Sequence, residues 1–193
     1  PSPSPSPIPD PTPPTVSITS PIVQRIAKGS VQVTTNAQDN VGITSAEFII
    51  DGQTIASGPA INYTWNTSGL VLNSNHTVQV KVFDAAGNFG LSEQKTYKII
   101  NDADHDGFSD EVEAVTGTAV NVACGANNWP PDFNNDGSAT TVDVLQFVPL
   151  LNSISGDGRY NGRYDIDGNG RITTLDILLF PPILNKTCTS LVY

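Results

Sequence analysis

The stretches DFNNDGSATTVD (132–143) and DIDGNGRITTLD (165–176) decide how the C-terminal part of this chain folds. Shifting residues 132–152 by 33 positions lays them on residues 165–185, and ten of the 21 aligned pairs are identical. Duplication at this period indicates two copies of one structural unit, each incomplete alone. The sequence therefore predicts a small domain made of two matching loops, each followed by a short helix.

Each stretch places oxygen-bearing side chains at the spacing that calcium requires. A twelve-residue calcium loop supplies ligands from positions 1, 3, 5, 7, 9 and 12, with a glycine at position 6 for the sharp turn. The upstream stretch DADHDGFSDEVE (102–113) fits the same pattern, with glutamate rather than aspartate at position 12. The predicted ligands, with position 7 acting through its backbone carbonyl, are Asp102, Asp104, Asp106, Phe108, Asp110 and Glu113 in loop one, Asp132, Asn134, Asp136, Ser138, Thr140 and Asp143 in loop two, and Asp165, Asp167, Asn169, Arg171, Thr173 and Asp176 in loop three. We expect three bound Ca²⁺ ions.

The distribution of charge agrees with this prediction. The 193 residues carry 19 acidic and 9 basic side chains, a net charge of -10, and residues 101–193 hold thirteen of the acids but only four of the bases. Carboxylates this close together repel one another unless a cation lies between them. The same excess of acid argues against nucleic acid or an anionic membrane surface as a partner. No apolar run approaches the roughly 18 residues of a membrane helix, so membrane insertion is not expected.

Residues 15–100 carry a different pattern, in which apolar and polar residues alternate. Val78, Val80 and Val82 are one example, and turn signals such as Asp51-Gly52 separate the segments. Roughly seven short strands at this spacing predict an antiparallel β-sandwich. The expected fold class is therefore mainly β with a small α component: an Ig-like sandwich followed by a region of calcium loops and short helices.

Three phrases in this half resemble the bacterial Ig-like domains of secreted proteins: PPTVSITSP (13–21), QDNVGITSAEFIIDG (38–52) and VFDAAGNFG (82–90). That resemblance implies an extracellular spacer or adhesive module. Residues 102–118 resemble a thrombospondin type 3 calcium repeat. The paired loops closed by aspartate, within residues 124–189, resemble the type I dockerin domain. This last resemblance implies a fold built around two calcium ions that binds a β-sandwich receptor called a cohesin.

The dockerin resemblance also places the residues that select a partner. In that family, partner choice rests largely on loop positions 10 and 11, which here are Thr141, Val142, Thr174 and Leu175. The threonines match the family and their apolar neighbours depart from it. Pro149 and Pro181 should end or kink the helices near Phe147 and Phe180, because proline removes a hydrogen bond and clashes with the preceding turn. These departures favour a partner other than an ordinary cohesin.

Cys124 and Cys188 flank the duplicated loops, where dockerin-like folds bring their ends together. A disulfide between them would close both ends of the unit and indicates an extracytoplasmic setting. Two free thiols or a zinc pair are the alternatives, and neither has supporting ligands in the sequence. The expected divisions are a Pro-rich arm at 1–14, an Ig-like sandwich at 15–100, a calcium-binding linker at 101–123 and a dockerin-like domain at 124–193. The arm is interpreted as a linker or as a segment that docks on a neighbouring subunit.

No catalytic set is visible, so an enzyme is not expected. His76 and His105 are the only histidines, and the calcium spacing accounts for the acidic clusters. Tyr63, Trp65 and Trp129 are interpreted as core residues, with a sugar-binding platform as the alternative. The main hypothesis is a secreted bacterial structural protein that binds another copy of itself head to tail and builds a calcium-dependent fibre. The alternatives are the non-catalytic anchoring tail of a larger secreted enzyme, with a cohesin-like partner, and a carbohydrate-binding or adhesive module.

Overall fold

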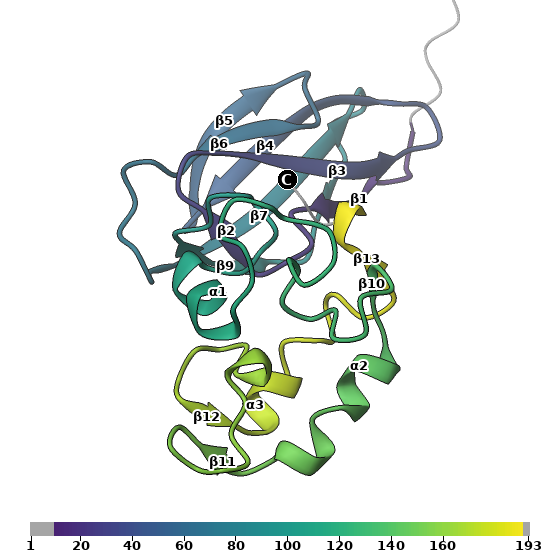
Figure 1. The fold of residues 1–193 in the computed structure, drawn as a ribbon. Helices are drawn as coiled ribbons and strands as arrows, with labels where there is room; N and C mark the ends of the chain where they lie inside the picture. Colours follow the sequence, from purple (N-terminus) through teal and green to yellow (C-terminus); the bar gives the residue numbers. More distant parts are fainter. Residues whose placement is uncertain (1–9, 191–193) are drawn as a thin grey trace, which may run out of the picture. The chain divides into compact units, whose positions relative to one another are not determined.

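The computed structural model describes residues 10–190, so most of the Pro-rich arm predicted at 1–14 lies outside the described residues. The chain divides into two compact units. The described part of the first comprises residues 10–19, 33–63 and 76–96, and that of the second comprises 20–32, 64–75 and 97–190. The fold is mainly β, an Ig-like sandwich followed by a small helical region (Figure 1).

Nine strands form between residues 15 and 100. They are β1 (Thr15–Ser20), β2 (Arg25–Ala27), β3 (Ser30–Gln38), β4 (Ile43–Ile50), β5 (Gln53–Gly58), β6 (Tyr63–Asn66), β7 (Asn75–Asp84), β8 (Phe89–Leu91) and β9 (Lys95–Ile100). One sheet has the order β1-β3-β6, and the other has the order β2-β9-β7-β4-β5, with β8 paired to β7. The sequence predicts roughly seven strands, and the structure has two more because the three-residue strands β2 and β8 are also present.

The first unit shows why the alternating pattern forms strands. β4 pairs antiparallel with β5 and with β7, and Phe48 lies opposite Val80 in the register. Ala46 and Val82 are each 0% exposed, and intervening residues point to the other face. Burying one side chain in two explains the period of two in the sequence.

The second unit combines strand ends with the whole calcium-loop region. β2 pairs parallel with β9, an exception to the antiparallel pattern expected from the sequence. Val23, next to β2, belongs to the same buried cluster as Phe108, Trp129 and Phe147. The side chain of Arg25 lies over the ring of Phe108, 4.5 Å from its centroid. Loop one therefore packs directly on residues that precede β3.

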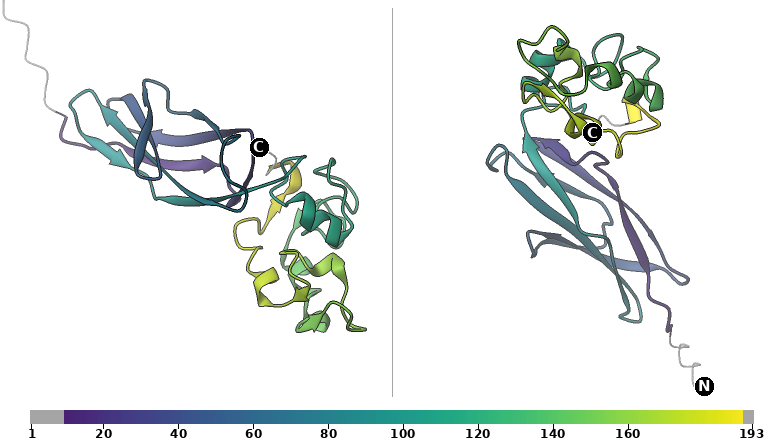
Figure 2. Two further views of the ribbon diagram at one scale, coloured as in Figure 1. Left: turned by 90° about the vertical axis from the view of Figure 1, so that its left-hand side faces the viewer. Right: turned by 90° about the horizontal axis from the view of Figure 1, so that it is seen from below.

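Short elements make up residues 101–190 (Figure 2). The helices are α1 (Asp110–Thr116), α2 (Thr141–Leu145) and α3 (Thr174–Ile177), with 3-10 turns at Val148–Leu150, Gly162–Tyr164 and Cys188–Ser190. The strands β10 (Ser138–Ala139) and β13 (Lys186–Thr187) pair antiparallel, as do β11 (Ser153–Ile154) and β12 (Arg171–Ile172). Both α2 and α3 end before Phe147 and Phe180, as the prolines predict.

Aromatic side chains form much of the core of this region. Phe147 contacts Phe133, Tyr164 and Phe180 edge to face, with ring centroids 5.2, 5.5 and 5.7 Å apart. Trp129 lies in this core and is 1% exposed, and Trp65, in β6 of the sandwich, is 4% exposed. Both are thereby confirmed as core residues.

Across the described residues, no helix has the length and apolar character needed to cross a membrane.

Candidate calcium-binding sites

All three predicted loops adopt the same backbone turn. In each, the carboxylate at position 1 accepts hydrogen bonds from the backbone N–H groups at positions 5 and 6. These bonds run to Asp102 from Asp106 (3.2 Å) and Gly107 (2.9 Å), to Asp132 from Asp136 (3.1 Å) and Gly137 (2.9 Å), and to Asp165 from Asn169 (3.0 Å) and Gly170 (2.8 Å). The glycines have φ of 89°, 86° and 81°, a conformation that side chains disfavour. The turn that position 6 requires is therefore present in each loop.

Loop one brings its carboxylates together in a buried setting. One oxygen from each of Asp102, Asp104 and Asp106 lies within 4.8 Å of the others. The closing residue, Glu113, is 0% exposed, and neither of its carboxylate oxygens accepts a hydrogen bond of normal geometry. One oxygen of Asp106 is also enclosed and unpartnered. Buried carboxylate oxygens without donors are costly, and a divalent cation among them removes that cost.

The same burial shifts the acidity of these groups. Burial, together with the neighbouring carboxylates, raises the pKa of Asp106 to about 9. The same causes raise the pKa of Glu113 to about 8, although the nearby Thr118 hydroxyl offsets part of the increase. Burial also raises the pKa of Asp102 to about 6, against the hydrogen bonds from Gly107 and His105. The ion-free loop therefore favours protons, and a cation that binds there displaces them.

Loops two and three hold their closing carboxylates differently. Asp143 accepts hydrogen bonds from the Thr140 backbone N–H (2.8 Å) and hydroxyl (2.9 Å), and from Phe133 N–H (2.9 Å). Asp176 accepts from Thr173 N–H (2.8 Å) and Asp167 N–H (3.2 Å). Both aspartates are N3 residues of capping boxes. Protein donors therefore hold both closing residues in place. Each Asp176 oxygen accepts one of these bonds and keeps lone-pair capacity for an ion, whereas each Asp143 oxygen accepts two, because Asn134 N–H also donates to Asp143 Oδ1, so an ion there would have to displace or share donors.

The two loops differ in their acidic clusters. One oxygen each of Asp165, Asp167 and Asp176 lies within 4.8 Å of the others. Burial raises the pKa of Asp176 to about 6, against the hydrogen bond from Thr173. Among the described residues, loop two shows no cluster of three carboxylates this close, and its position 3 is an amide, Asn134. The ligand sets of all three loops, including the carbonyls at position 7, stay predictions.

The residues predicted to select a partner lie at the surface. Thr141 and Thr174 are exposed, and Val142 and Leu175 are 54% and 56% exposed. The structure also exposes two apolar side chains that the sequence analysis did not name: Leu145 and Leu178, also related by the 33-residue shift, are 66% and 63% exposed. An apolar residue three positions after a predicted partner-binding residue, on the same helix face, is the signal that could have found them.

The two cysteines form the disulfide that the sequence predicts. Cys124 and Cys188 are bonded, with Cα atoms 5.7 Å apart. The bond joins the segments before loop two and after loop three, whereas loop one lies outside the bridged segment. The alternatives of free thiols and a zinc pair are therefore wrong.

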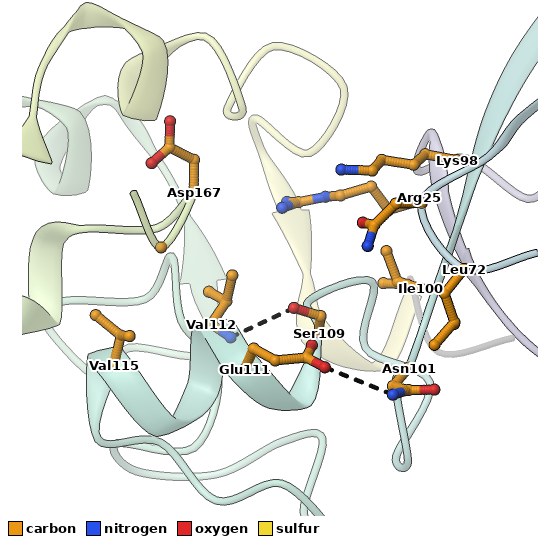
Figure 3. A pocket seen from close by; sticks show the side chains of 12 residues that line it. Arg25, Leu72, Lys98, Ile100, Asn101, Ser109, Glu111, Val112, Val115 and Asp167 are labelled. Carbon is orange, nitrogen blue, oxygen red and sulfur yellow. Dashed lines mark hydrogen bonds between the residues drawn. The ribbon is translucent and has the colours of Figure 1, made fainter. Parts of the chain in front are cut away.

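A pocket of about 360 Å³ lies within the second unit (Figure 3). Arg25 and Lys98 lie on one side of it, and Asp167 and Val115 on the other. Its lining residues include no histidine or cysteine, and the hydroxyl of Ser109 accepts a hydrogen bond from the Val112 N–H as the cap of α1. The lining therefore contains neither an imidazole nor a thiol.

These features define a class: a modular, mainly β protein whose C-terminal region contains duplicated acidic loops, with a disulfide joining the segments before and after them. Comparison with known proteins makes the class specific. Residues 14–80 match the family model of a bacterial Ig domain, and residues 130–184 match the model of the dockerin type I domain. The chain thus carries a bacterial Ig-like domain followed by a type I dockerin domain.

Several chains of known structure are similar to parts of this one. The fibronectin(III)-like modules of Clostridium thermocellum CbhA are 26% identical, with 45% of each chain covered and a TM-score of 0.35. Chitinase ChiA74 from Bacillus thuringiensis is 26% identical over 45% of this chain and 13% of that chain, with a TM-score of 0.32. A type II Cohesin-X-Dockerin complex from Acetivibrio cellulolyticus, a C-terminal interface mutant, is 14% identical over 92% of this chain and 99% of that chain, with a TM-score of 0.27. The chain spans less than half the length of the first two. No curated protein matches it.

The family matches decide several expectations. Both matched modules are non-catalytic, and they indicate an extracellular bacterial protein. Dockerin type I domains typically bind Ca²⁺, and acidic clusters are present in loops one and three. Neither match covers residues 101–123, so the thrombospondin type 3 resemblance there stays a prediction. The matches support the anchoring alternative better than the main hypothesis of a self-assembling fibre.

Proposed function

We propose that this chain is a calcium-dependent anchoring module, in which the dockerin domain binds a cohesin-type β-sandwich on a scaffold protein of the cellulosome type. The observation that carries the proposal is the dockerin match at residues 130–184, which covers both duplicated loops. Calcium binding in loops two and three orients the helices that carry the partner-binding residues. The Ig-like domain, which precedes the dockerin domain in the sequence, serves as a spacer.

The surface of α2 and α3 supports this proposal. Val142, Leu145, Leu175 and Leu178 leave large apolar side chains in solvent at matched positions of the two copies. Exposed apolar residues of this kind are typical of a surface that a protein partner covers. Since the two copies present equivalent residues, each helix offers a similar contact to the same kind of partner.

Binding of purified cohesin domains to the full chain, measured by calorimetry in millimolar calcium and again after chelation, tests the proposal. We expect one cohesin to bind with calcium and none without it. The double variant Leu145→Glu/Leu178→Glu should abolish binding, because it places charges in an apolar contact. The control Val41→Glu, at a residue 71% exposed in the first unit, should bind as the wild type does. A panel of cohesins that all fail to bind the folded, calcium-loaded chain would overturn the proposal.

Light scattering of the chain alone separates this function from the fibre hypothesis. An anchoring module stays monomeric in calcium until a cohesin is added, whereas head-to-tail assembly increases the mass with concentration. Carbohydrate binding through an aromatic platform has less support, because Trp65 and Trp129 are both buried and Tyr63 is half-buried.

A further inference from the structure

A third cluster of carboxylates lies in the Ig-like half, where the sequence spacing predicts no calcium loop. One oxygen from each of Asp10, Asp39 and Asp84 lies within 4.8 Å of the others, and all three residues belong to the first unit. Asp10 precedes β1, Asp39 follows β3, and Asp84 is the last residue of β7. Three separate segments of the chain therefore bring their acidic side chains to one place.

Two of these carboxylates contain an oxygen that has no hydrogen-bond donor in the described chain. Asp10 Oδ2 and Asp39 Oδ1 each expose less than 1 Å² and accept no hydrogen bond. Asp84 is 4% exposed as a residue. Burying a carboxylate oxygen without a donor is costly, and three carboxylates together add mutual repulsion. The unpaired oxygens are thus an observation independent of the clustering.

The remaining oxygens of the cluster are held by the protein. Asp10 Oδ1 accepts hydrogen bonds from Thr12 N–H (3.0 Å) and Asn40 Nδ2 (3.1 Å). Asp39 Oδ2 accepts hydrogen bonds from Val41 N–H (3.0 Å) and Gly42 N–H (2.7 Å). The two Asp84 oxygens accept hydrogen bonds from Asn88 N–H (2.8 Å) and Nδ2 (2.6 Å). Asn88 Nδ2 also donates to the Asp10 carbonyl (2.7 Å). These bonds fix the orientation of each carboxylate. Among the described residues, the ion pairs His76–Asp51 and Arg159–Asp157 include none of the three.

The chemistry of the cluster selects its ligand. It offers oxygen donors only, with up to three negative charges and neither imidazole nor thiol, a set that suits a hard divalent cation. Enclosed, unpartnered carboxylate oxygens also mark Glu113 in loop one.

We propose that Asp10, Asp39 and Asp84 bind a Ca²⁺ ion in the Ig-like domain, in addition to those of the C-terminal loops. The ion joins the segment ahead of β1 to the turn after β3 and to the end of β7. It therefore fixes the point at which the Pro-rich arm meets the sandwich. Calcium then stabilises this domain as well as the dockerin region.

Equilibrium dialysis of the full chain against calcium, from micromolar to 10 mM, tests the proposal by counting bound ions. The variant Asp10→Asn/Asp39→Asn should bind one ion fewer per chain than the wild type. The control Glu47→Gln/Glu93→Gln removes the same charge from the same unit and should bind the wild-type number. In the wild type, the amide resonances of Gly42 and Asn88 should shift on titration with calcium, and in the variant they should not.

Equal numbers of bound ions in the wild type and the variant, with both chains folded by circular dichroism, would overturn the proposal. Amide resonances of Gly42 and Asn88 that do not respond to 10 mM calcium in the wild type would also overturn it. The single variant Asp10→Asn provides a second test, because its change lies outside every strand and should leave the sandwich folded.

Discussion

Loop one and the duplicated loops have the same ligand spacing but hold the closing carboxylate in different ways. In loop one the cap of α1 is Ser109, at loop position 8, so Glu113 is the fourth residue of the helix. In loops two and three the caps are Thr140 and Thr173, at position 9, so the closing aspartates are N3 residues. A shift of one residue in the start of the helix changes what the closing residue contacts.

This difference predicts that the three predicted calcium loops depend on a bound ion to different degrees. An N3 aspartate joins a capping box and has protein donors whether or not calcium is bound. Glu113 lies beyond reach of that arrangement, and neither of its oxygens accepts a hydrogen bond of normal geometry. Loop one should therefore lose most of its order when calcium is removed, and the capped loops should lose less.

The disulfide gives the largest expected effect. Cys124→Ala/Cys188→Ala opens a bridge between residues 64 apart in sequence, which costs about 4 kcal/mol in the chain-entropy model. Because loop one lies outside the bridge, hydrogen exchange in calcium should rise at 132–143 and 165–176 and change little at 102–116. Equal increases at all three loops would show that they unfold as one unit and would break the comparison.

The pH dependence of the ion-free chain is the next effect in size. The raised pKa values of Asp106 and Glu113, about 9 and 8, mean that the folded chain binds more protons than the unfolded chain between about pH 4 and pH 9. The contribution of these two groups to the free energy of unfolding should therefore fall as pH rises through this range, and it should not change with pH below it. Urea unfolding in chelator measures this trend.

Saturating calcium should reverse the trend, because the ion competes with protons for the same oxygens. In loop three the corresponding change should be confined to lower pH, since the pKa of Asp176 is about 6. An ion-free chain whose stability rises from pH 5 to pH 8 would contradict the assignment of loop one as the more ion-dependent loop.

Substituting the closing residues separates the loops directly. Glu113→Gln should stabilise the ion-free chain at pH 8, because it removes a buried charge without donors. In calcium it should destabilise the chain by about 1.4 kcal/mol at ten times the dissociation constant, since loop one loses its closing ligand. Thermal unfolding with and without chelator measures both signs.

Asp143→Asn is the matched substitution in loop two. It should destabilise the chain in both conditions, by about 1 kcal/mol without calcium. Each carboxylate oxygen of Asp143 faces two donors, and the amide nitrogen that replaces one oxygen cannot accept their hydrogen bonds. If both substitutions change the free energy of unfolding in the same direction in chelator, the difference between the two kinds of closing residue does not exist in solution.

Substitutions at or next to the helix N-caps have the smallest expected effects on stability. Thr140→Ala should cost about 1 kcal/mol, and Ser109→Ala somewhat less, because the Thr140 hydroxyl bonds both the Val142 N–H and Asp143. Thr174→Ala, at an exposed residue after a cap, should change stability by less than about 0.5 kcal/mol. A Ser109 effect larger than that of Thr140 would count against the role given to the capping box.

Much of the fold and of the loops could be predicted from the sequence, because both depend on short-range spacing. Alternating residues such as Val78 and Val80 mark a strand whichever partner it pairs with. The position-6 glycines mark a turn that only a few residues define. The start of each helix was harder to predict, since Ser109 and Thr140 are both good caps and packing decides which position is used.

Sequence by itself determined the two kinds of module, the twelve-residue loops and the cysteine pair, because each is set by residues close in the chain or by their chemistry. Tertiary structure alone decided which carboxylate oxygens lack donors, and which residues far apart in sequence meet. Asp10, Asp39 and Asp84 are separated by 29 and 45 positions, and no local pattern connects them. Their proximity follows from strand pairing and turn geometry, which depend on the packing of the whole domain.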